Sequence, residues 1–389
     1  MQDQRQNIRR VEFPKSTKEA LHHLEQLCIP FTQLRPPTSK QLDYIGELID
    51  EFVFLDHGPK RAHRRKKMTS MQELQVLVIL CRFFSSSMAD GVKNTVFMMI
   101  FTSPGGKPDS TTNDRMLFLG KLISLAISMK SSLLLNCAGV WMQQRGCSKE
   151  HLLGIAKTVS DDHFVLSPNK AELTKWVELS PHFTSCFLST VSEIYGRTGT
   201  INQFKPPPRL LLEVTTEWIA SSTTLALAPL LINLQPLLPK GSIVMTAVTP
   251  FVGLIRWCVE IPLLRLLCQI RDKEEDEIHA TEDLESKLLL GLLESMNEKP
   301  NLEHRLQQPE VVSPRQMCIL IKGVAESFSE IPAEYHTHKL AQTSLDRLGQ
   351  ALQIALASGC LYGNTHELFQ ALRQLPRNRL LQIIIYRHT

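Results

Sequence analysis

The sequence predicts an all-α protein, an irregular helical array of stacked helical hairpins of the HEAT or armadillo kind. Leu is abundant while only 6% of the 389 residues are aromatic, and stretches in which Val, Ile or Thr alternate with polar residues are scarce. Such a composition is poor material for β-sheets. Many segments instead repeat apolar residues at spacings of three and four, which gives a helix one apolar face. No consensus of fixed length recurs, so the array is expected to be irregular.

Three helices are predicted from their starts and apolar rows. Capping boxes at Ser16-x-x-Glu19 and Ser70-x-x-Glu73 are expected to begin the first two, because a hydroxyl and a carboxylate at this spacing bond each other's backbone. Ser344 is expected to begin the third, with Arg347 and Gln350 on its exposed face. The expected buried residues are Leu21, Leu24, Leu27 and Cys28, then Met71, Leu74, Leu77, Val78, Cys81 and Phe84, then Leu345, Leu348, Leu352, Ala355 and Leu356.

Further helices follow from the same periodicity, joined by segments rich in Gly and Pro such as SPGGKPDS between 103 and 110. They are expected near 40–55, 90–101, 114–129, 132–144, 149–160, 169–179, 182–195, 208–220, 242–260, 284–297, 313–329 and 365–374.

One change in composition indicates a domain boundary. The segment RDKEEDEIHATEDLE, Arg271 to Glu285, is dense in acid and nearly free of large apolar residues, so it should be a solvated loop or the beginning of a helix. We therefore expect a helical block at 1–270 containing an exposed basic loop at 57–68, an acidic linker at 271–283, and a helical block at 284–389.

The basic loop accounts for the formal net charge of +4, because the rest of the chain has 37 basic and 39 acidic residues. Contiguous like charges repel one another and should stay in solvent, where a nuclear-import receptor reads extended Lys and Arg side chains. Incidental solvated charge and contact with RNA or DNA are the alternatives, and the lack of interleaved aromatic residues counts against the last. The candidate import residues are Lys60, Arg61, Arg64, Arg65, Lys66 and Lys67.

No membrane span, secretion signal or disulfide framework is expected. Residues 218–239 carry no Asp, Glu, Lys or Arg, but Pro229, Pro236 and Pro239 interrupt them, so buried helices explain this stretch better. The N-terminus, MQDQRQNIRR, lacks the apolar core of a signal peptide. The nine cysteines form no C-x-x-C pair and are expected to be reduced and buried.

A search for catalytic chemistry predicts no enzyme, no metal and no cofactor. Gly105 to Lys107 resembles a phosphate-binding loop only superficially, because Pro108 stands where Ser or Thr should bind magnesium. Asp161-Asp162-His163 has suitable residue types for a metal or acid–base site, yet neighbouring side chains on a helix point in different directions. This triplet and His336-x-His338 are therefore interpreted as structural polar groups.

The segment TPFVGLIRWCVEIPL, Thr249 to Leu263, carries Arg256 and Trp257 inside an apolar stretch. Trp257 could fill the core while Arg256 caps backbone carbonyls or pairs with an acid such as Glu260, and this interpretation is favoured. Alternatively, the two residues anchor a partner interface, because Trp and Arg are over-represented among binding hot spots. Together with Arg347 they are the candidate interface residues.

Four segments, taken together and in order, resemble the Integrator complex subunit 15 family: SMQELQVLVILCRFF, TPFVGLIRWCVEIPL, SLDRLGQALQIALASG and LPRNRLLQIII. The resemblance implies a nuclear, non-enzymatic helical scaffold that binds other Integrator subunits. It would join the module of subunits 10, 13 and 14 to the core subunits. It would thereby support cleavage of nascent RNA polymerase II transcripts, snRNA 3′-end processing and transcription termination. A nuclear adaptor that binds nucleic acid through the basic loop is the alternative.

Overall fold

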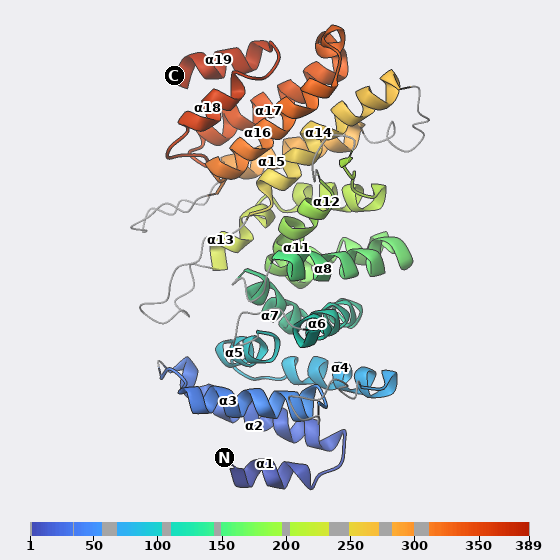
Figure 1. The fold of residues 1–389 in the computed structure, drawn as a ribbon, viewed down its shortest axis with the longest axis vertical. Helices are drawn as coiled ribbons and strands as arrows, with labels where there is room; N and C mark the ends of the chain where they lie inside the picture. The colour runs from blue at the N-terminus through green and yellow to red at the C-terminus, as the bar shows by residue number, and fades with distance from the viewer. Residues whose placement is uncertain are drawn as a thin grey trace. The chain divides into compact units, whose positions relative to one another are not determined.

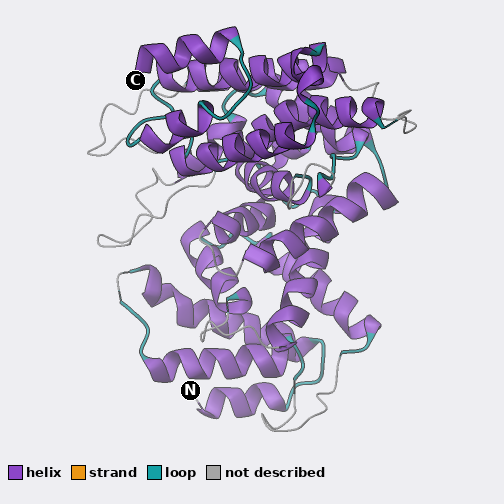
Figure 2. Cartoon of the chain, turned by 45° about the horizontal axis from the view of Figure 1, so that its top comes forward, coloured by secondary structure: helices purple, strands orange, loops and turns teal. Residues whose placement is uncertain are grey.

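The computed structural model describes residues 2–33, 35–56, 68–102, 110–143, 149–196, 203–232, 249–271, 282–298 and 311–388. Every regular element in these ranges is a helix (Figure 2). The prediction of an all-α fold is therefore confirmed, whereas the HEAT or armadillo arrangement stays a prediction.

The chain forms two compact units. The first comprises Met1–Val159 and Gln235–Ile243, and the second comprises Ser160–Leu234 and Val244–Thr389. Helices from both sides of the predicted linker 271–283 pack together inside the second unit. Most of the linker lies outside the described residues, so the division at 271–283 stays a prediction about composition.

The first unit begins with a short polar helix and continues through longer amphipathic ones (Figure 1). Its elements are α1 (Gln2–Arg9), α2 (Lys15–Thr32), α3 (Ser39–Leu48) with its π-helical continuation η1 (Ile49–Val53), α4 (Ser70–Phe84), α5 (Asp90–Phe101), α6 (Ser110–Ser128), α7 (Ser132–Gln143) and α8 (Lys149–Ser160).

Aromatic side chains fill part of the core of the first unit, where α2 packs on α5, α4 on α6, and both α5 and α6 on α7. The ring centroids of Phe84 and Phe97 lie 5.3 Å apart, and those of Phe97 and Phe101 lie 4.8 Å apart. All three rings are fully buried. The first pair is edge to face and the second is tilted, and aromatic pairs at such distances add to the stability that apolar burial supplies.

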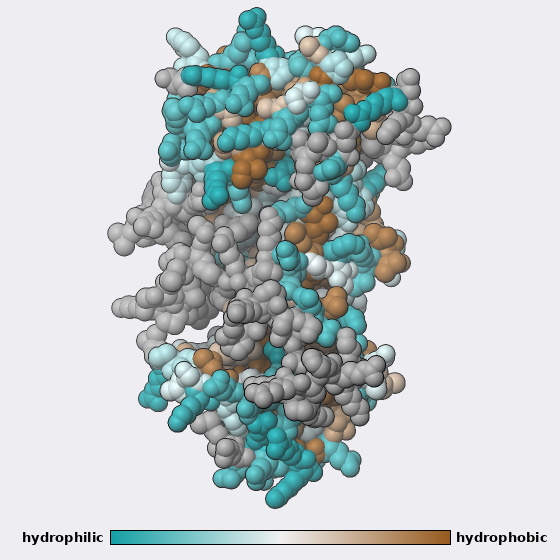
Figure 3. Space-filling view, in the orientation of Figure 1, coloured by the Kyte–Doolittle hydropathy of each residue, from teal (hydrophilic) through white to brown (hydrophobic). Residues whose placement is uncertain are grey.

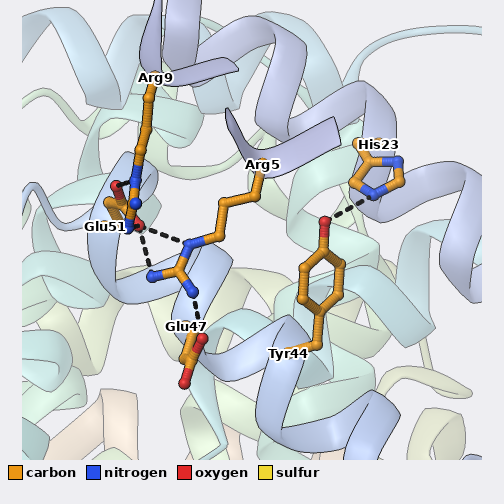
Figure 4. A network of polar contacts seen from close by, with 6 residues as sticks. All are labelled: Arg5, Arg9, His23, Tyr44, Glu47 and Glu51. Carbon is orange, nitrogen blue, oxygen red and sulfur yellow. Dashed lines mark hydrogen bonds and ion pairs between the residues drawn. The ribbon is translucent and has the colours of Figure 1, made fainter. Parts of the chain in front are cut away.

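Ion pairs attach α1 to α3 and η1 (Figure 4). Arg5 Nε donates to Glu51 Oε2 over 2.7 Å, and Arg9 Nη2 donates to the same oxygen over 3.0 Å. Arg5 also pairs with Glu47. Ile8 is the buried apolar residue of this otherwise polar helix. We call Arg5, Arg9, Glu47 and Glu51 the surface cluster.

Two predicted helix starts are wrong by one or two residues. The capping box of α4 is Thr69 with Gln72, in which Gln72 N donates to Thr69 Oγ1 over 3.3 Å and Thr69 N donates to Gln72 Oε1 over 3.0 Å. A glutamine carbonyl accepts as a carboxylate does, so the neighbouring box could replace the expected one at Ser70. Pro14 precedes α2, and Ser16 is buried inside that helix.

The second unit contains the longest described helix, α14. Its elements are η2 (Asp161–Leu166), α9 (Lys170–Leu173), α10 (Trp176–Leu179), α11 (Pro181–Ile194), α12 (Arg209–Ser221), η4 (Leu225–Leu227), α13 (Ala228–Ile232), α14 (Phe251–Ile270), α15 (Glu282–Asn297), α16 (Pro314–Glu330), η6 (Ala333–Thr337), α17 (Lys339–Ala357), α18 (His366–Leu372) and α19 (Arg379–His388).

Helix α14 lies in the middle of the second unit, where it contacts α11, α15, α16 and α17. Every residue from Trp257 to Leu263 is buried, so α14 has neighbours on all sides. Leu345, Leu348 and Leu352 of α17 are fully buried, as their spacing predicts. No helix in the described ranges is long and apolar enough to cross a membrane.

The expected buried face of α4 is only partly right. Met71 and Leu74 are 65% and 52% exposed, whereas Val76, Ile79 and Leu80 are buried. Neighbouring helices therefore cover more than one face of the second half of α4. In its first two turns, the side that the apolar spacing predicted to be buried is exposed to solvent.

Candidate functional site

Three of the four segments that carry the family resemblance meet in the second unit. TPFVGLIRWCVEIPL lies in α14, SLDRLGQALQIALASG lies in α17, and LPRNRLLQIII includes most of α19. Helix α17 packs against both α14 and α19. The segments are therefore parts of one packing arrangement, although 85 residues separate some of the groups that touch.

Side chains of α17 donate hydrogen bonds to backbone carbonyls of α14 close to Pro262. Proline has no backbone N–H, so the carbonyl four residues earlier, that of Cys258, loses its donor within the helix. Arg347 Nη1 of α17 donates to Cys258 O over 2.9 Å. Ser344 Oγ of α17 donates to the next carbonyl, that of Val259, over 2.7 Å. The helix was expected to end at 260, yet it continues to Ile270, supported by these bonds.

Ser344 and Arg347 thus differ from their expected roles. Helix α17 begins at Lys339, where Leu340 N donates to His338 Nδ1 over 3.3 Å, so Ser344 lies inside the helix rather than at its start. Arg347 was expected on the exposed face, and this is wrong, since its side chain is 6% exposed. Its long side chain reaches the neighbouring helices, which residue spacing alone does not reveal.

A buried ion cluster joins α14, α15 and α17. Glu285 accepts a hydrogen bond from Arg347 Nη1 over 2.8 Å and pairs with Arg265 through its other oxygen. Ser286 Oγ accepts from Arg347 Nη2 over 2.8 Å. The side chains of Arg265 and Glu285 are 2% and 0% exposed. We call Arg265, Glu285 and Arg347 the buried cluster.

The buried cluster constrains the geometry of three helices at once. A buried charge is tolerated only when it is paired and hydrogen-bonded, so the three side chains must meet with correct distances or α15 cannot pack. Glu285 is the last residue of the segment RDKEEDEIHATEDLE, which was expected to be a solvated loop or the beginning of a helix. The observed helix begins at Glu282, and its first turns carry this buried carboxylate.

Trp257 and Arg256 lie beside α11 within the second unit. The Trp257 side chain is fully buried, and its Nε1 donates to the carbonyl of Tyr195. Arg256 is half-buried, and its guanidinium lies against Gly196. The interface role proposed for Arg256, Trp257 and Arg347 stays a prediction. The burial of Trp257 and Arg347 means that either residue would act by fixing the shape of a surface that other side chains form.

The candidate import residues lie outside the described part of the chain, which is interrupted between Asp56 and Met68. Their role stays a prediction. They are Lys60, Arg61, Arg64, Arg65, Lys66 and Lys67.

The histidines that resembled parts of an active site make structural contacts. His163 of η2 meets Trp176 edge to face, with ring centroids 5.4 Å apart. His336 Nε2 lies 3.1 Å from Phe328 O and 3.0 Å from Ile331 O, and His338 receives the first backbone bond of α17. Among the described residues, no group of three His, Cys, Asp or Glu side chains could hold a metal ion.

A cysteine–histidine pair on α11 was missed by the sequence reasoning. His182 Nε2 lies 3.6 Å from Cys186 Sγ, a contact that the spacing of four residues could have indicated. Burial lowers the pKa of His182 to about 4 and raises the pKa of Cys186 to about 12. Both groups are therefore neutral near pH 7, whereas a nucleophilic cysteine needs a thiolate.

The described cysteines support the expectation of buried thiols. All eight are thiols rather than members of a disulfide, and all except the partly exposed Cys268 are buried. Burial raises the pKa of Cys28 and Cys137 to about 12 in each case, which keeps them protonated and unreactive.

Among the described residues, exposed large apolar side chains lie on several different helices, and Figure 3 shows brown groups at separate places on one face. Helix α19 carries two exposed apolar side chains, Ile383 and Tyr386, and arginines lie on the same side of the helix. Sequence analysis did not single out this face, although the spacing of Arg379, Ile383, Tyr386 and Arg387 indicates it. We call Arg379, Gln382, Ile383, Tyr386 and Arg387 the α19 outer face.

Comparison with known proteins gives a consistent result. The family model for Integrator complex subunit 15 matches residues 2–377. The Drosophila melanogaster protein named Integrator complex subunit 15 is 31% identical over 392 residues, covering 97% of this chain and 94% of that protein. Proteins with the same name from Homo sapiens and Danio rerio are 31% and 30% identical, each covering 99% of this chain and respectively 87% and 81% of their own length.

Proposed function

Since the chain belongs to the Integrator complex subunit 15 family, we propose that it is a subunit of the Integrator complex and acts as a non-enzymatic scaffold. The family match over residues 2–377 is the observation that carries this proposal. A scaffold binds partners along helical faces and needs neither cofactor nor metal.

The chemistry of the described residues supports a scaffold rather than an enzyme. The cysteine–histidine pair of α11 is neutral and buried, and the histidines of η2 and η6 contact neighbouring rings and carbonyls. The strongest charge arrangement, the buried cluster, is enclosed by three helices. These groups serve the packing of the chain, which is what a rigid binding surface requires.

We further propose that the chain works in the nucleus and joins the module of Integrator subunits 10, 13 and 14 to the core subunits. In this position it would support cleavage of nascent RNA polymerase II transcripts, snRNA 3′-end processing and transcription termination. The scaffold itself would cut nothing, since its contribution is to hold other subunits in place.

Affinity purification from nuclear extract followed by mass spectrometry tests membership. The tagged chain should recover other Integrator subunits, and its depletion should separate subunits 10, 13 and 14 from the core while both groups stay intact. Unprocessed snRNA 3′ ends should then accumulate. Recovery of no Integrator subunit would contradict membership, whereas an undisturbed module–core contact after depletion would contradict only the joining role.

The basic segment 60–67 supports a proposal of its own, namely recognition by an importin-type receptor. The alternative function is a nuclear adaptor that binds nucleic acid through the same six basic side chains. A gel shift of the purified chain with single-stranded RNA separates the two, because phosphate contact by such a segment weakens steeply with salt. Binding lost on removal of the segment would favour the adaptor, and no shift at low salt would exclude it.

A further inference from the structure

Helix α19 presents a stripe of five side chains to solvent. Arg379, Gln382, Ile383, Tyr386 and Arg387 follow one another at spacings of three, one, three and one, which places them on one side of a helix. Tyr386 is 87% exposed and Ile383 is 40% exposed. Tyr and Arg are the residue types that contribute most to protein interfaces.

The opposite side of α19 is fixed to α17. Leu381 and Ile384 are buried there, and Leu380 packs over Gly349, where a Cβ atom would come within 2.8 Å of Leu380 Cδ2. Asn378 Oδ1 accepts from Leu381 N over 3.1 Å, while Asn378 Nδ2 donates to Asp346 Oδ1 over 2.7 Å. The outer face is therefore formed before any partner arrives, which lowers the entropy lost on binding.

Basic side chains predominate from residue 368 onward, while the Asp346 carboxylate of α17 is bonded to Asn378 at the beginning of α19. Glu367 is the last acidic residue of the chain, and four arginines follow it. In the described ranges no carboxylate pairs with the guanidinium groups of Arg373, Arg377, Arg379 or Arg387. Arg379 also occupies the first turn of α19, where the helix dipole disfavours a cation.

We propose that the α19 outer face binds an acidic amphipathic helix of a partner protein. Apolar residues of such a helix would cover Ile383 and Tyr386, while its Asp and Glu side chains would pair with Arg379 and Arg387. A nucleic acid would satisfy the arginines but leave Ile383 against polar phosphates. A second copy of the same face would place arginine against arginine. This inference rests on the proposed function in one respect, namely that the chain works inside an assembly with other proteins.

Site-specific photo-crosslinking in the full-length chain tests the proposal. A photoreactive amino acid replaces Gln382, which lies within the face and carries none of the proposed contacts, and the assembled complex is irradiated and analysed by mass spectrometry. We expect crosslinks to one partner segment that is amphipathic at helical spacing and net acidic. The double variant Arg379→Glu, Arg387→Glu should lower their yield by about tenfold or more.

A matched control distinguishes this contact from general loss of charge. Arg315 and Lys322 on α16 are exposed and lie seven residues apart, so Arg315→Glu with Lys322→Glu makes the same charge change elsewhere. This control should leave the crosslink unchanged, and both double variants should keep the melting temperature of the wild type. Replacing the crosslinked Asp and Glu residues of the partner by Lys should restore the crosslinking yield of the Arg379→Glu, Arg387→Glu variant.

Several outcomes would overturn the proposal: no discrete crosslink, crosslinks to RNA, to a second copy or to a basic segment, or a yield that the double variant leaves unchanged. These results differ from failure of the proposed function. If the wild-type chain recovers no Integrator subunit, membership fails, but the crosslink from position 382 still reports which partner the α19 outer face binds.

Discussion

A glutamate bridges two arginines in each unit, but the two arrangements differ in their access to water. In the surface cluster, Glu51 is 13% exposed while Arg5 and Arg9 are 23% and 52% exposed (Figure 4). In the buried cluster, Glu285 is 0% exposed. Water replaces a lost partner at the surface, whereas no such replacement reaches Glu285. The same residue types therefore attach a short helix in one unit and set the relative positions of three helices in the other.

The largest effect should come from Glu285→Ala, which leaves two buried arginines without their carboxylate. We expect a loss of about 3–5 kcal/mol in the free energy of unfolding of the second unit. The corresponding Glu51→Ala change should cost about 1 kcal/mol or less, since exposed pairs contribute little. Urea unfolding followed by tryptophan fluorescence measures both effects, with Trp141→Phe added so that only tryptophans of the second unit report on Glu285.

A compensating variant keeps this prediction testable if Glu285→Ala does not fold. Replacing the whole buried cluster by apolar residues of similar size, as Arg265→Met, Glu285→Leu and Arg347→Met, removes the uncompensated charges. It should recover much of the lost stability, because a buried ion pair is often no better than well-packed apolar groups. If the triple variant is less stable than Glu285→Ala, the two unpaired buried arginines are not the reason why Glu285→Ala lowers the stability.

The next effect concerns the carbonyls beside Pro262. Ser344→Ala removes the donor to Val259 O and should cost about 1 kcal/mol. Ser327 is an equally buried serine, but its hydroxyl donates to Gly323 O within its own helix over 3.0 Å, so Ser327→Ala should change stability little. Equal losses in the two variants, measured by the same unfolding experiment, would show that the inter-helix bond has no special value.

The surface cluster should weaken in acid. Burial alone would raise the pKa of Glu51, but the hydrogen bonds and charges of Arg9 and Arg5 outweigh it and lower the pKa below the ordinary 4.5. A depressed pKa stabilises the folded state fully above the ordinary value, and this contribution is lost as pH falls through the depressed one. The protection of residues 2–9 against hydrogen exchange, relative to the intrinsic exchange rate at each pH, should therefore fall below about pH 4.5, and Glu51→Gln should abolish this fall in protection.

The smallest effect on stability should come from the basic segment. Replacing Lys60, Arg61, Arg64, Arg65, Lys66 and Lys67 by Ala should leave the melting temperature nearly unchanged, because a solvated segment contributes little packing. The same variant should move to the cytoplasm if the segment is the import signal. Fusion of residues 57–68 to a reporter excludes import together with partners. A reporter that stays cytoplasmic would contradict the import proposal.

The positions of most helices could be predicted from the sequence because local apolar spacing determines them. Helices α5, α7 and α8 begin at the expected residues, and α5 and α8 also end where expected. The predicted helix ends were wrong where a neighbouring residue could form the cap instead, as at Thr69. They were also wrong where a distant residue bonded the backbone and so allowed the helix to continue. Pro262 indicates a helix end by every local criterion, and only contacts from residues 85 and 89 positions away carry α14 past it.

The candidate site was less predictable for the same reason. Sequence spacing placed Arg347 on the exposed face of its helix, and nothing local pairs it with Glu285, which lies 62 residues earlier. Trp257 was correctly favoured as a core residue, because tryptophan is usually buried whichever partner it finds. The α19 outer face could be predicted from the spacing of its residues. That Arg379 and Arg387 form no ion pair with a described carboxylate could be known only from the tertiary structure.

Pro262 also has a consequence for the order in which the chain is made. A nascent chain contains α14 long before Ser344 and Arg347 leave the ribosome, so its Cys258 carbonyl must meanwhile bond to water or to other proteins. Closing so long a stretch of chain carries an entropic cost that local helices do not have. The centre of the second unit is therefore completed only after α17 has been synthesised, and its apolar helix is the part that chaperones would have to protect in the interval.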